Sequence, residues 1–226
     1  MNMTMGSNLP TWLTPLAWVV LALAVATAAA VADDIYRRGH RHPHLASELT
    51  WIGSGLYLGP LALLVYRRHG RSTTDTTTVT TAGGVTAGLP GGAASAVAHL
   101  IGVPLVIASG LTIAGIDLWV MIIVIAVLAT VMLFFYERTT PAAAAATGAG
   151  RLPVVAALGA AAITVLAFDI GMGGWMLLLH FTATMPPATD ATFWLLMQIG
   201  IILGVITGYP AVRRLNRRHR ATSTLA

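Results

Sequence analysis

Residues 118–135 read LWVMIIVIAVLATVMLFF, an apolar stretch without a single charge. A run of about 18 such residues is long enough to cross the hydrocarbon of a membrane as a helix. Backbone polar groups find no water there, and long unbroken runs lack the alternation of barrel strands, so we expect helices. The chain has six apolar runs, which predict spans at 11–32, 45–66, 93–114, 117–136, 152–181 and 193–212.

The composition points to the same class of protein. Only 9% of the 226 residues are charged, whereas soluble domains carry about 25%. We therefore predict an all-α fold, a polytopic membrane bundle of about six transmembrane helices that forms a single membrane domain over residues 1–226. The stretches 72–92, rich in threonine and glycine, and 137–151, rich in alanine, are predicted to be flexible linkers.

The basic residues are all arginines, and they stand in short clusters beside the apolar runs. Arginine is enriched in the cytoplasmic loops of membrane proteins. With both termini in the cytoplasm, ten arginines lie inside, and only Arg37, Arg38 and Arg41 lie outside. We therefore predict that both termini lie in the cytoplasm. The clusters favour contact with the lipid bilayer and its anionic headgroups, not with nucleic acid.

Asp169 is the most informative single residue, because it lies far from both ends of the run 152–181. An ionisable side chain at that depth is costly unless it faces a cavity or a partner. Met172, Met176 and His180 follow at +3, +7 and +11, which places the four side chains on one helix face. Together they could pass a proton or a soft cation such as Cu(I). A neutral Asp169 that ties two helices together by a hydrogen bond is the alternative, and the pattern favours it slightly over a transport site.

Three other polar residues fall within the apolar runs. His99 stands in the run 93–114, five residues before Pro104, and Gln198 stands in the last run. Both are candidates for a polar intramembrane site. Glu48 lies near the start of the second run, where we expect its carboxylate to reach toward the headgroups.

Two further patterns carry weaker signals. His40, His42 and His44 alternate in one loop, and histidine-rich tracts can bind Zn, Cu or Ni. A metal ion is therefore allowed there, although three arginines nearby repel cations, and no other cofactor is expected. Gly200, Gly204 and Gly208 recur every four residues, a spacing typical of close helix packing in membranes.

No pattern in the chain is typical of an enzyme. Metalloprotease, hydrolase, P-loop and dinucleotide-binding motifs are missing from the sequence, and the chain has no cysteine for a thiolate site. Asp169 and His180, the one candidate acid–base pair, lie about 16 Å apart along a helix. Two functions remain: a small transporter or channel-like protein for protons or a metal cation, or a non-catalytic scaffold or accessory subunit. The second would assemble through the glycine strip, as a homo-oligomer or with a membrane partner.

Several blocks carry a resemblance to a known family. Residues 51–66, WIGSGLYLGPLALLVY, followed by RRHGR, form the first block, and residues 168–176, FDIGMGGWM, form the second. The segments MQIG at 197–200 and GYP at 208–210 belong to a third. These blocks resemble a family of uncharacterised bacterial polytopic membrane proteins, catalogued as a domain of unknown function. The resemblance runs from about residue 33 onward. It implies a multi-span helical fold in the plasma (inner) membrane of a bacterium, without an established activity.

The chain departs from that family at one point. Many members carry cysteines beside a histidine in the third span, whereas His99 is followed here by Leu100 and Ile101. The resemblance therefore does not imply a thiolate metal site in this chain.

Overall fold

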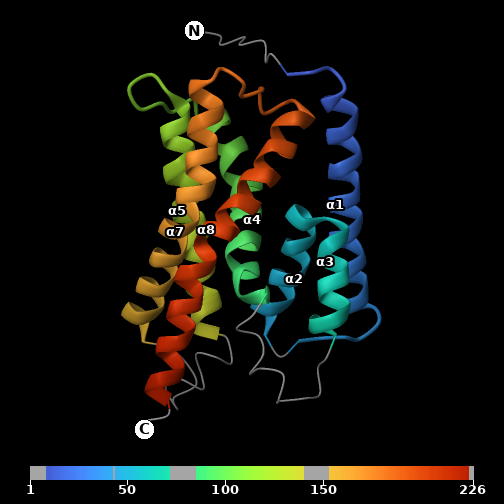
Figure 1. The fold of residues 1–226 in the computed structure, drawn as a ribbon, viewed down its shortest axis with the longest axis vertical. Helices are drawn as coiled ribbons and strands as arrows, with labels where there is room; N and C mark the ends of the chain where they lie inside the picture. The colour runs from blue at the N-terminus through green and yellow to red at the C-terminus, as the bar shows by residue number, and fades with distance from the viewer. Residues whose placement is uncertain (1–8, 43, 72–84, 140–152, 224–226) are drawn as a thin grey trace.

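The computed structural model describes residues 9–42, 44–71, 85–139 and 153–223, which form a bundle of helices standing side by side (Figure 1). No β-strand occurs among these residues, apart from an isolated bridge between Ile113 and Ile116 in a turn. The all-α prediction is confirmed. The helices are α1 (Leu13–Tyr36), α2 (Leu45–Leu58), α3 (Pro60–Val65), α4 (Leu89–Ser109), α5 (Asp117–Thr139), α7 (Val154–Phe181) and α8 (Ala191–Ser223).

Five helical segments within the described residues are long and apolar enough to cross a membrane. They are Leu13–Tyr36, Thr86–Ser109, Asp117–Thr139, Val154–Phe181 and Ala191–Leu215. The remaining predicted run, 45–66, is divided between α2 and α3, and a π-helical turn at Tyr66–Gly70 follows them. The chain is thus a multi-pass helical protein of the predicted class.

Helical structure extends into both of the predicted linkers. A 3₁₀ turn occupies Val85–Gly88, and α4 begins at Leu89, inside the predicted linker 72–92. Pro90 stands in the first turn of α4, where a missing N–H breaks no helical hydrogen bond. Helix α5 continues to Thr139, past the predicted start of the linker 137–151. Residues 72–84 and 140–152 lie outside the described part of the chain.

The predicted span 45–66 does not form one continuous helix. Helix α2 ends at Leu58, and Gly59 has φ +54° and ψ −137°, a conformation that glycine adopts far more readily than other residues. Pro60 then starts α3 in a new direction. The rings of Trp51 and Tyr66, fifteen residues apart, lie with centroids 5.5 Å from each other. The run therefore folds into a helical hairpin, which returns to the end of the bundle where it began (Figure 1).

Small residues let this hairpin pack tightly between α1 and α4. A Cβ atom on Gly53 would lie 2.9 Å from the Cβ of Ala93, and one on Gly55 would lie 2.8 Å from the backbone of Ala28. Any larger side chain at these two positions would push α2 away from its neighbours. The backbone of α2 thus lies directly against both flanking helices.

The packing of α1 against α8 shows in which direction each of these two helices runs through the bundle. Ala17 of α1 packs with Ala191 and Leu195 at the start of α8, while Ala24 and Ile202, further along both helices, line one cavity. Helices α1 and α8 therefore run in the same direction. Helix α1 begins at one end of the bundle and α8 finishes at the other (Figure 1). The first turn of α1 and the last turn of α8 thus lie at opposite ends of the bundle, whereas the prediction places both termini on one side, because the hairpin returns to the end where it began.

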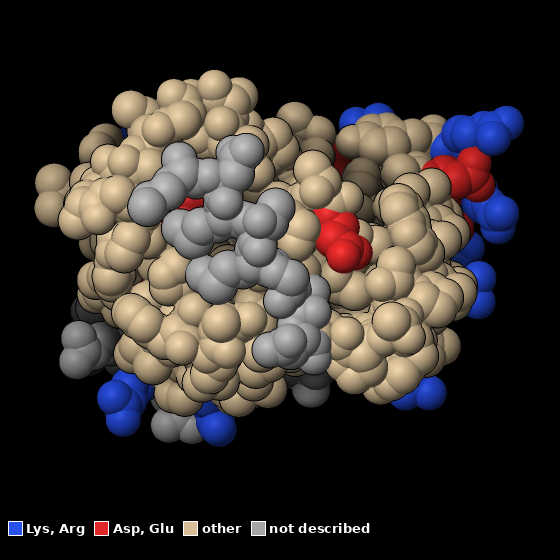
Figure 2. Space-filling view, turned by 90° about the horizontal axis from the view of Figure 1, so that it is seen from above, with Lys and Arg blue, Asp and Glu red and all other residues tan. Residues whose placement is uncertain are grey.

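The arginines gather at the end where α1 finishes. Arg71, after the hairpin, donates to the carboxylate of Asp34 near the end of α1, with Nε 2.9 Å from Oδ2. Seen from the opposite end, arginines appear only at the rim (Figure 2). The arginine side chains described at this end are Arg37, Arg38, Arg41, Arg67, Arg68, Arg71, Arg138, Arg213 and Arg214. The positive-inside rule then predicts a cytoplasmic arginine end and the start of α1 on the opposite side.

Cysteine labelling tests this arrangement, and the cysteine-free chain gives no background reaction. We expect Arg38→Cys and His69→Cys to react with a membrane-impermeant maleimide from the same side of sealed vesicles, because the hairpin returns. Thr112→Cys, in the turn between α4 and α5, should react from the other side. If Arg38→Cys instead reacts from the same side as Thr112→Cys, the residues 45–66 cross the membrane.

Candidate functional site

His99 lies in the middle of α4 and is only 2% exposed. Its Nδ1 is 2.8 Å from the carbonyl oxygen of Ser95, one helical turn earlier. A carbonyl oxygen can only accept, so we assign the ring hydrogen to Nδ1 and leave a lone pair on Nε2. That Nε2 is buried and has no hydrogen-bond partner among the described residues. Buried polar atoms normally have partners, so this atom marks a place where a proton, water or ion could bind.

His99 lines a small cavity of about 10 Å³. That volume is about the least that holds one water molecule. The cavity lies between α4, α5 and α7, and four of its residues are sequence-predicted site residues. Its lining consists of His99, Ile122, Ile125, Asp169, Met172, Gly173 and Met176.

Asp169 contributes the acidic group of this cavity. Its carboxylate has no hydrogen bond or ion pair within the described part of the chain, and its side chain is neither fully buried nor fully exposed. Met172 and Met176 are each 2% exposed. The spacing of 3 and 7 residues therefore brings these side chains to one face of α7, as the periodicity predicts. That face meets His99 of α4, which sequence spacing alone could not show.

The two methionines do not play the same part. A Cβ atom on Gly200 of α8 would lie 2.5 Å from the Sδ atom of Met172, so this sulfur rests on the bare backbone of α8. The thioether of Met172 is thus engaged in the contact between α7 and α8. Within the described residues, no group of three or more His, Asp or Glu side chains could hold a metal ion.

The glycine strip of α8 packs inside the same chain. Gly204 faces the ring of Phe168, with a Cβ position 2.6 Å from Cε1, and Gly208 faces the Phe168 backbone at 3.6 Å. Trp175 of α7 donates its indole N–H to the carbonyl of Leu196, at 2.9 Å. The strip therefore serves the contact of α7 with α8. All three glycines are buried in this contact, so assembly with another protein, the second function considered from the sequence, would use a surface other than this strip.

Two predicted site residues lie elsewhere. His180 is not among the residues that line the cavity, and its ring contacts that of Phe181 with centroids 5.4 Å apart. Gln198 lies at the hairpin tip, where its Nε2 donates to the carbonyl oxygen of Leu56 at 2.7 Å. The residue four positions after Leu56 is Pro60, which has no N–H to offer this carbonyl. Gln198 thus supplies, from α8, the hydrogen bond that the broken helix lacks.

The predicted histidine metal site is not formed as a cluster. His40 Nδ1 lies 3.3 Å from the backbone oxygen of Asp34, and the His42 ring meets the Tyr66 ring edge-on at 6.4 Å. His44 precedes the first turn of α2 in an extended conformation. Residue 43 lies outside the described part of the chain.

Near these histidines lies a group of polar contacts that was not predicted from the sequence. We call it the polar latch: Asp34 with Arg71 and Tyr66, and Glu48 with Arg41. Asp34 accepts hydrogen bonds from Arg71 and from the hydroxyl of Tyr66, at 2.9 and 3.0 Å. Glu48 does not reach toward the headgroups as predicted, because its side chain is 1% exposed and accepts from Arg41 Nε at 2.7 Å. The partners of Asp34 are 32 and 37 residues away along the chain, so sequence spacing gave no signal for these contacts.

The surroundings of Glu48 favour its charged form. Burial alone raises the pKa of this carboxyl, but hydrogen bonds from the His42 backbone N–H and from Arg41 outweigh burial and hold the pKa below its usual value. In the same place, burial lowers the pKa of His42, although the charge of Glu48 opposes that shift. The latch therefore contains an ionised carboxylate and a neutral imidazole near pH 7.

The hydrogen bond at the hairpin tip generates one prediction. Gln198→Leu leaves the Leu56 carbonyl without a donor in an apolar region, so we expect a loss of about 1–3 kcal/mol in the free energy of unfolding. The measurement is unfolding of the purified protein in mixed micelles by a denaturing detergent. Thr130→Val is the matched control, because it removes a side-chain hydrogen bond to a carbonyl of its own helix. Equal effects of the two substitutions would contradict the role assigned to Gln198.

The latch generates a second prediction, on pH. The pKa of Glu48 is lower in the folded protein, so its stabilisation is complete above the unfolded value of about 4.3 and is lost as the pH falls through the folded value. We expect the thermal unfolding midpoint of Glu48→Gln to fall less on acidification below that pH than the wild-type midpoint does. Asp117→Asn, which changes an exposed carboxylate, should behave like the wild type. An unchanged acid dependence in Glu48→Gln would contradict this assignment.

Comparisons with known proteins place the chain. A comparison with curated proteins and one with solved structures gave no match. A family model described as Domain of unknown function (DUF4396) matches residues 82–220, which is more than half of the chain. The match includes α4, α5, α7 and α8, and with them the cavity of His99 and Asp169. The chain therefore belongs to the DUF4396 family, a domain of unknown function.

Proposed function

We propose that this protein moves protons across the membrane and that His99 and Asp169 take up and release them. One observation carries the proposal: His99, whose buried Nε2 has no partner among the described residues, and Asp169 line the same water-sized cavity. Ionisable side chains at membrane depth normally serve ion pathways or proton relays, since they are costly to keep there.

The chemistry of the two side chains suits a proton relay. The Nε2 of a neutral imidazole accepts a proton, and a carboxyl group donates one or, when ionised, accepts one. A single water in the cavity that both residues line could pass a proton between them in either direction. Met172, Met176 and the isoleucines of α5 surround this pair with apolar surface, which keeps bulk water away from the exchange.

A soft metal cation is the second candidate, and Met176 is the observation that favours it. Its thioether lines the cavity together with the imidazole, and both are ligands that Cu(I) accepts. Proton transfer is the better-supported function, because the sulfur of Met172 rests on Gly200 and leaves few soft ligands beside His99.

The test is proton flux into proteoliposomes that contain a pH-sensitive dye, with an imposed membrane potential. We expect Asp169→Asn and His99→Gln each to reduce the flux at least tenfold, because either change removes a carrier. His180→Gln is the matched control, since it removes a titratable group of the same helix outside the cavity. Undiminished flux in both cavity variants would contradict the proposal.

Copper uptake in the same vesicles separates the two candidates. If Cu(I) accumulates in wild-type vesicles, and Met176→Leu abolishes that uptake while leaving proton flux unchanged, the cavity carries the metal. If Met176→Leu changes neither, the proton is the transported species and Met176 is packing.

A further inference from the structure

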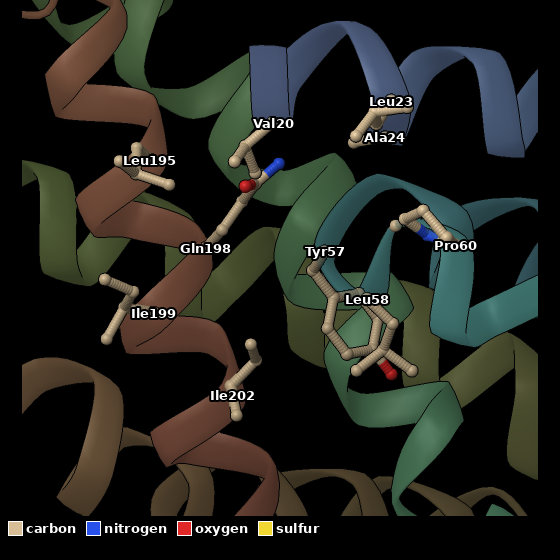
Figure 3. A pocket seen from close by; sticks show the side chains of 11 residues that line it. Val20, Leu23, Ala24, Tyr57, Leu58, Pro60, Leu195, Gln198, Ile199 and Ile202 are labelled. Carbon is tan, nitrogen blue, oxygen red and sulfur yellow. The ribbon is translucent and has the colours of Figure 1, made fainter. Parts of the chain in front are cut away.

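A larger cavity lies where the tip of the hairpin meets α1 and α8 (Figure 3), and it has a volume of about 240 Å³. Its floor is the turn from Tyr57 to Pro60, and its walls come from Val20–Ala24 and Leu195–Ile202. The cavity shares no residue with the one beside His99. It exists because α2 and α3 stop at the middle of α1 and α8 and turn back.

The protein closes this cavity at its two ends but not at its side. Ala17 packs against Ala191 and Leu195 and closes the end toward the start of both helices. The hairpin tip closes the other end. Leu23, Ile199 and Ile202 belong to the wall and are also 47%, 38% and 37% exposed. The cavity is therefore continuous with the lateral surface of the bundle, between α1 and α8.

The two side-chain donors of the cavity, on Gln198 and Tyr57, already have partners. The amide nitrogen of Gln198 donates to the carbonyl of Leu56, and the Tyr57 hydroxyl lies 3.5 Å from the carbonyl of Leu89. The remaining side chains of the wall are aliphatic (Figure 3). An apolar cavity of this size stays dry and takes up hydrocarbon in preference to water.

We propose that this cavity binds the hydrocarbon tail of a membrane phospholipid, which enters sideways between α1 and α8. The five long apolar helices place the side opening at the depth of the lipid tails. The opening is lined by branched aliphatic side chains, and it offers no charge that a headgroup or a soluble ligand would need. The tail occupies the part of the bilayer that the returning hairpin leaves without protein.

Photocrosslinking of the full chain tests the proposal. The protein is reconstituted into phosphatidylcholine vesicles that contain a small fraction of the same lipid with a diazirine near the end of one tail. We expect mass spectrometry to find crosslinks to Leu23, Ile199 and Ile202 several-fold more often than to Val127 and Val131. The two valines of α5 are exposed to a similar degree, at 57% and 48%, and report ordinary contact with lipid. Equal crosslinking of the two sets would overturn the proposal.

A filled cavity gives the second measurement. Ala24→Phe places a ring inside the wall and should reduce crosslinking at Ile199 and Ile202 several-fold, whereas Val25→Phe, on the exposed neighbouring residue, should not. Ile202→Trp fills the cavity from its open edge and serves if Ala24→Phe does not fold. Unchanged crosslinking in the filled variant would overturn the proposal.

Water access distinguishes a tail from a wet vestibule. Ile199→Cys should resist a membrane-impermeant maleimide added from either side of the vesicles, because lipid occupies the cavity. Rapid reaction of this cysteine would overturn the proposal and show that the cavity holds water.

Discussion

Pro60 has no N–H to give to the carbonyl of Leu56, and the arrangement around the hairpin depends on how that carbonyl is satisfied. In hydrocarbon, a backbone polar group without a partner is costly, because no water is present to replace the missing hydrogen bond. Gln198 of α8 removes that cost with one hydrogen bond of 2.7 Å. The bond ties the tip of the hairpin to a helix more than a hundred residues further along the chain. It fixes how deep the hairpin reaches and, with that, the floor of the large cavity.

The base of the hairpin is held by charge. Asp34 binds Arg71 and Tyr66, and Glu48 binds Arg41, so the two ends of the hairpin are joined to the end of α1 and the loop that follows it. Two buried carboxylates thereby compensate part of the positive charge that gathers at this end of the bundle. The backbone bond at the tip and the ion pairs at the base act on different parts of one element, and together they define its position.

The candidate site depends on a second form of close contact. The glycines of α8 let Phe168 and Met172 of α7 lie on bare backbone, which fixes the rotation of α7 about its axis. That rotation turns Asp169 and Met176 toward α4 and places them beside His99. A side chain larger than hydrogen at Gly200 would move Met172 first and Asp169 with it. Packing between α7 and α8 is therefore part of the geometry of a cavity that α8 does not line.

The amino-acid sequence by itself determined that the chain suits a membrane and that it is helical. It also determined that Asp169, Met172 and Met176 share one helix face. Each of these follows from composition or from the periodicity of one helix, which are local properties. Gly59 and Pro60 were visible in the sequence, yet their consequence was not, since a glycine and a proline within an apolar run are compatible with a kinked span as well as with a returning hairpin. Only the tertiary structure decided between the two, because that choice depends on Gln198, Asp34 and Arg71, whose contacts join distant parts of the chain. The same is true of His99 and Asp169, which share a cavity through the packing of α4 against α7 and not through any spacing along the chain.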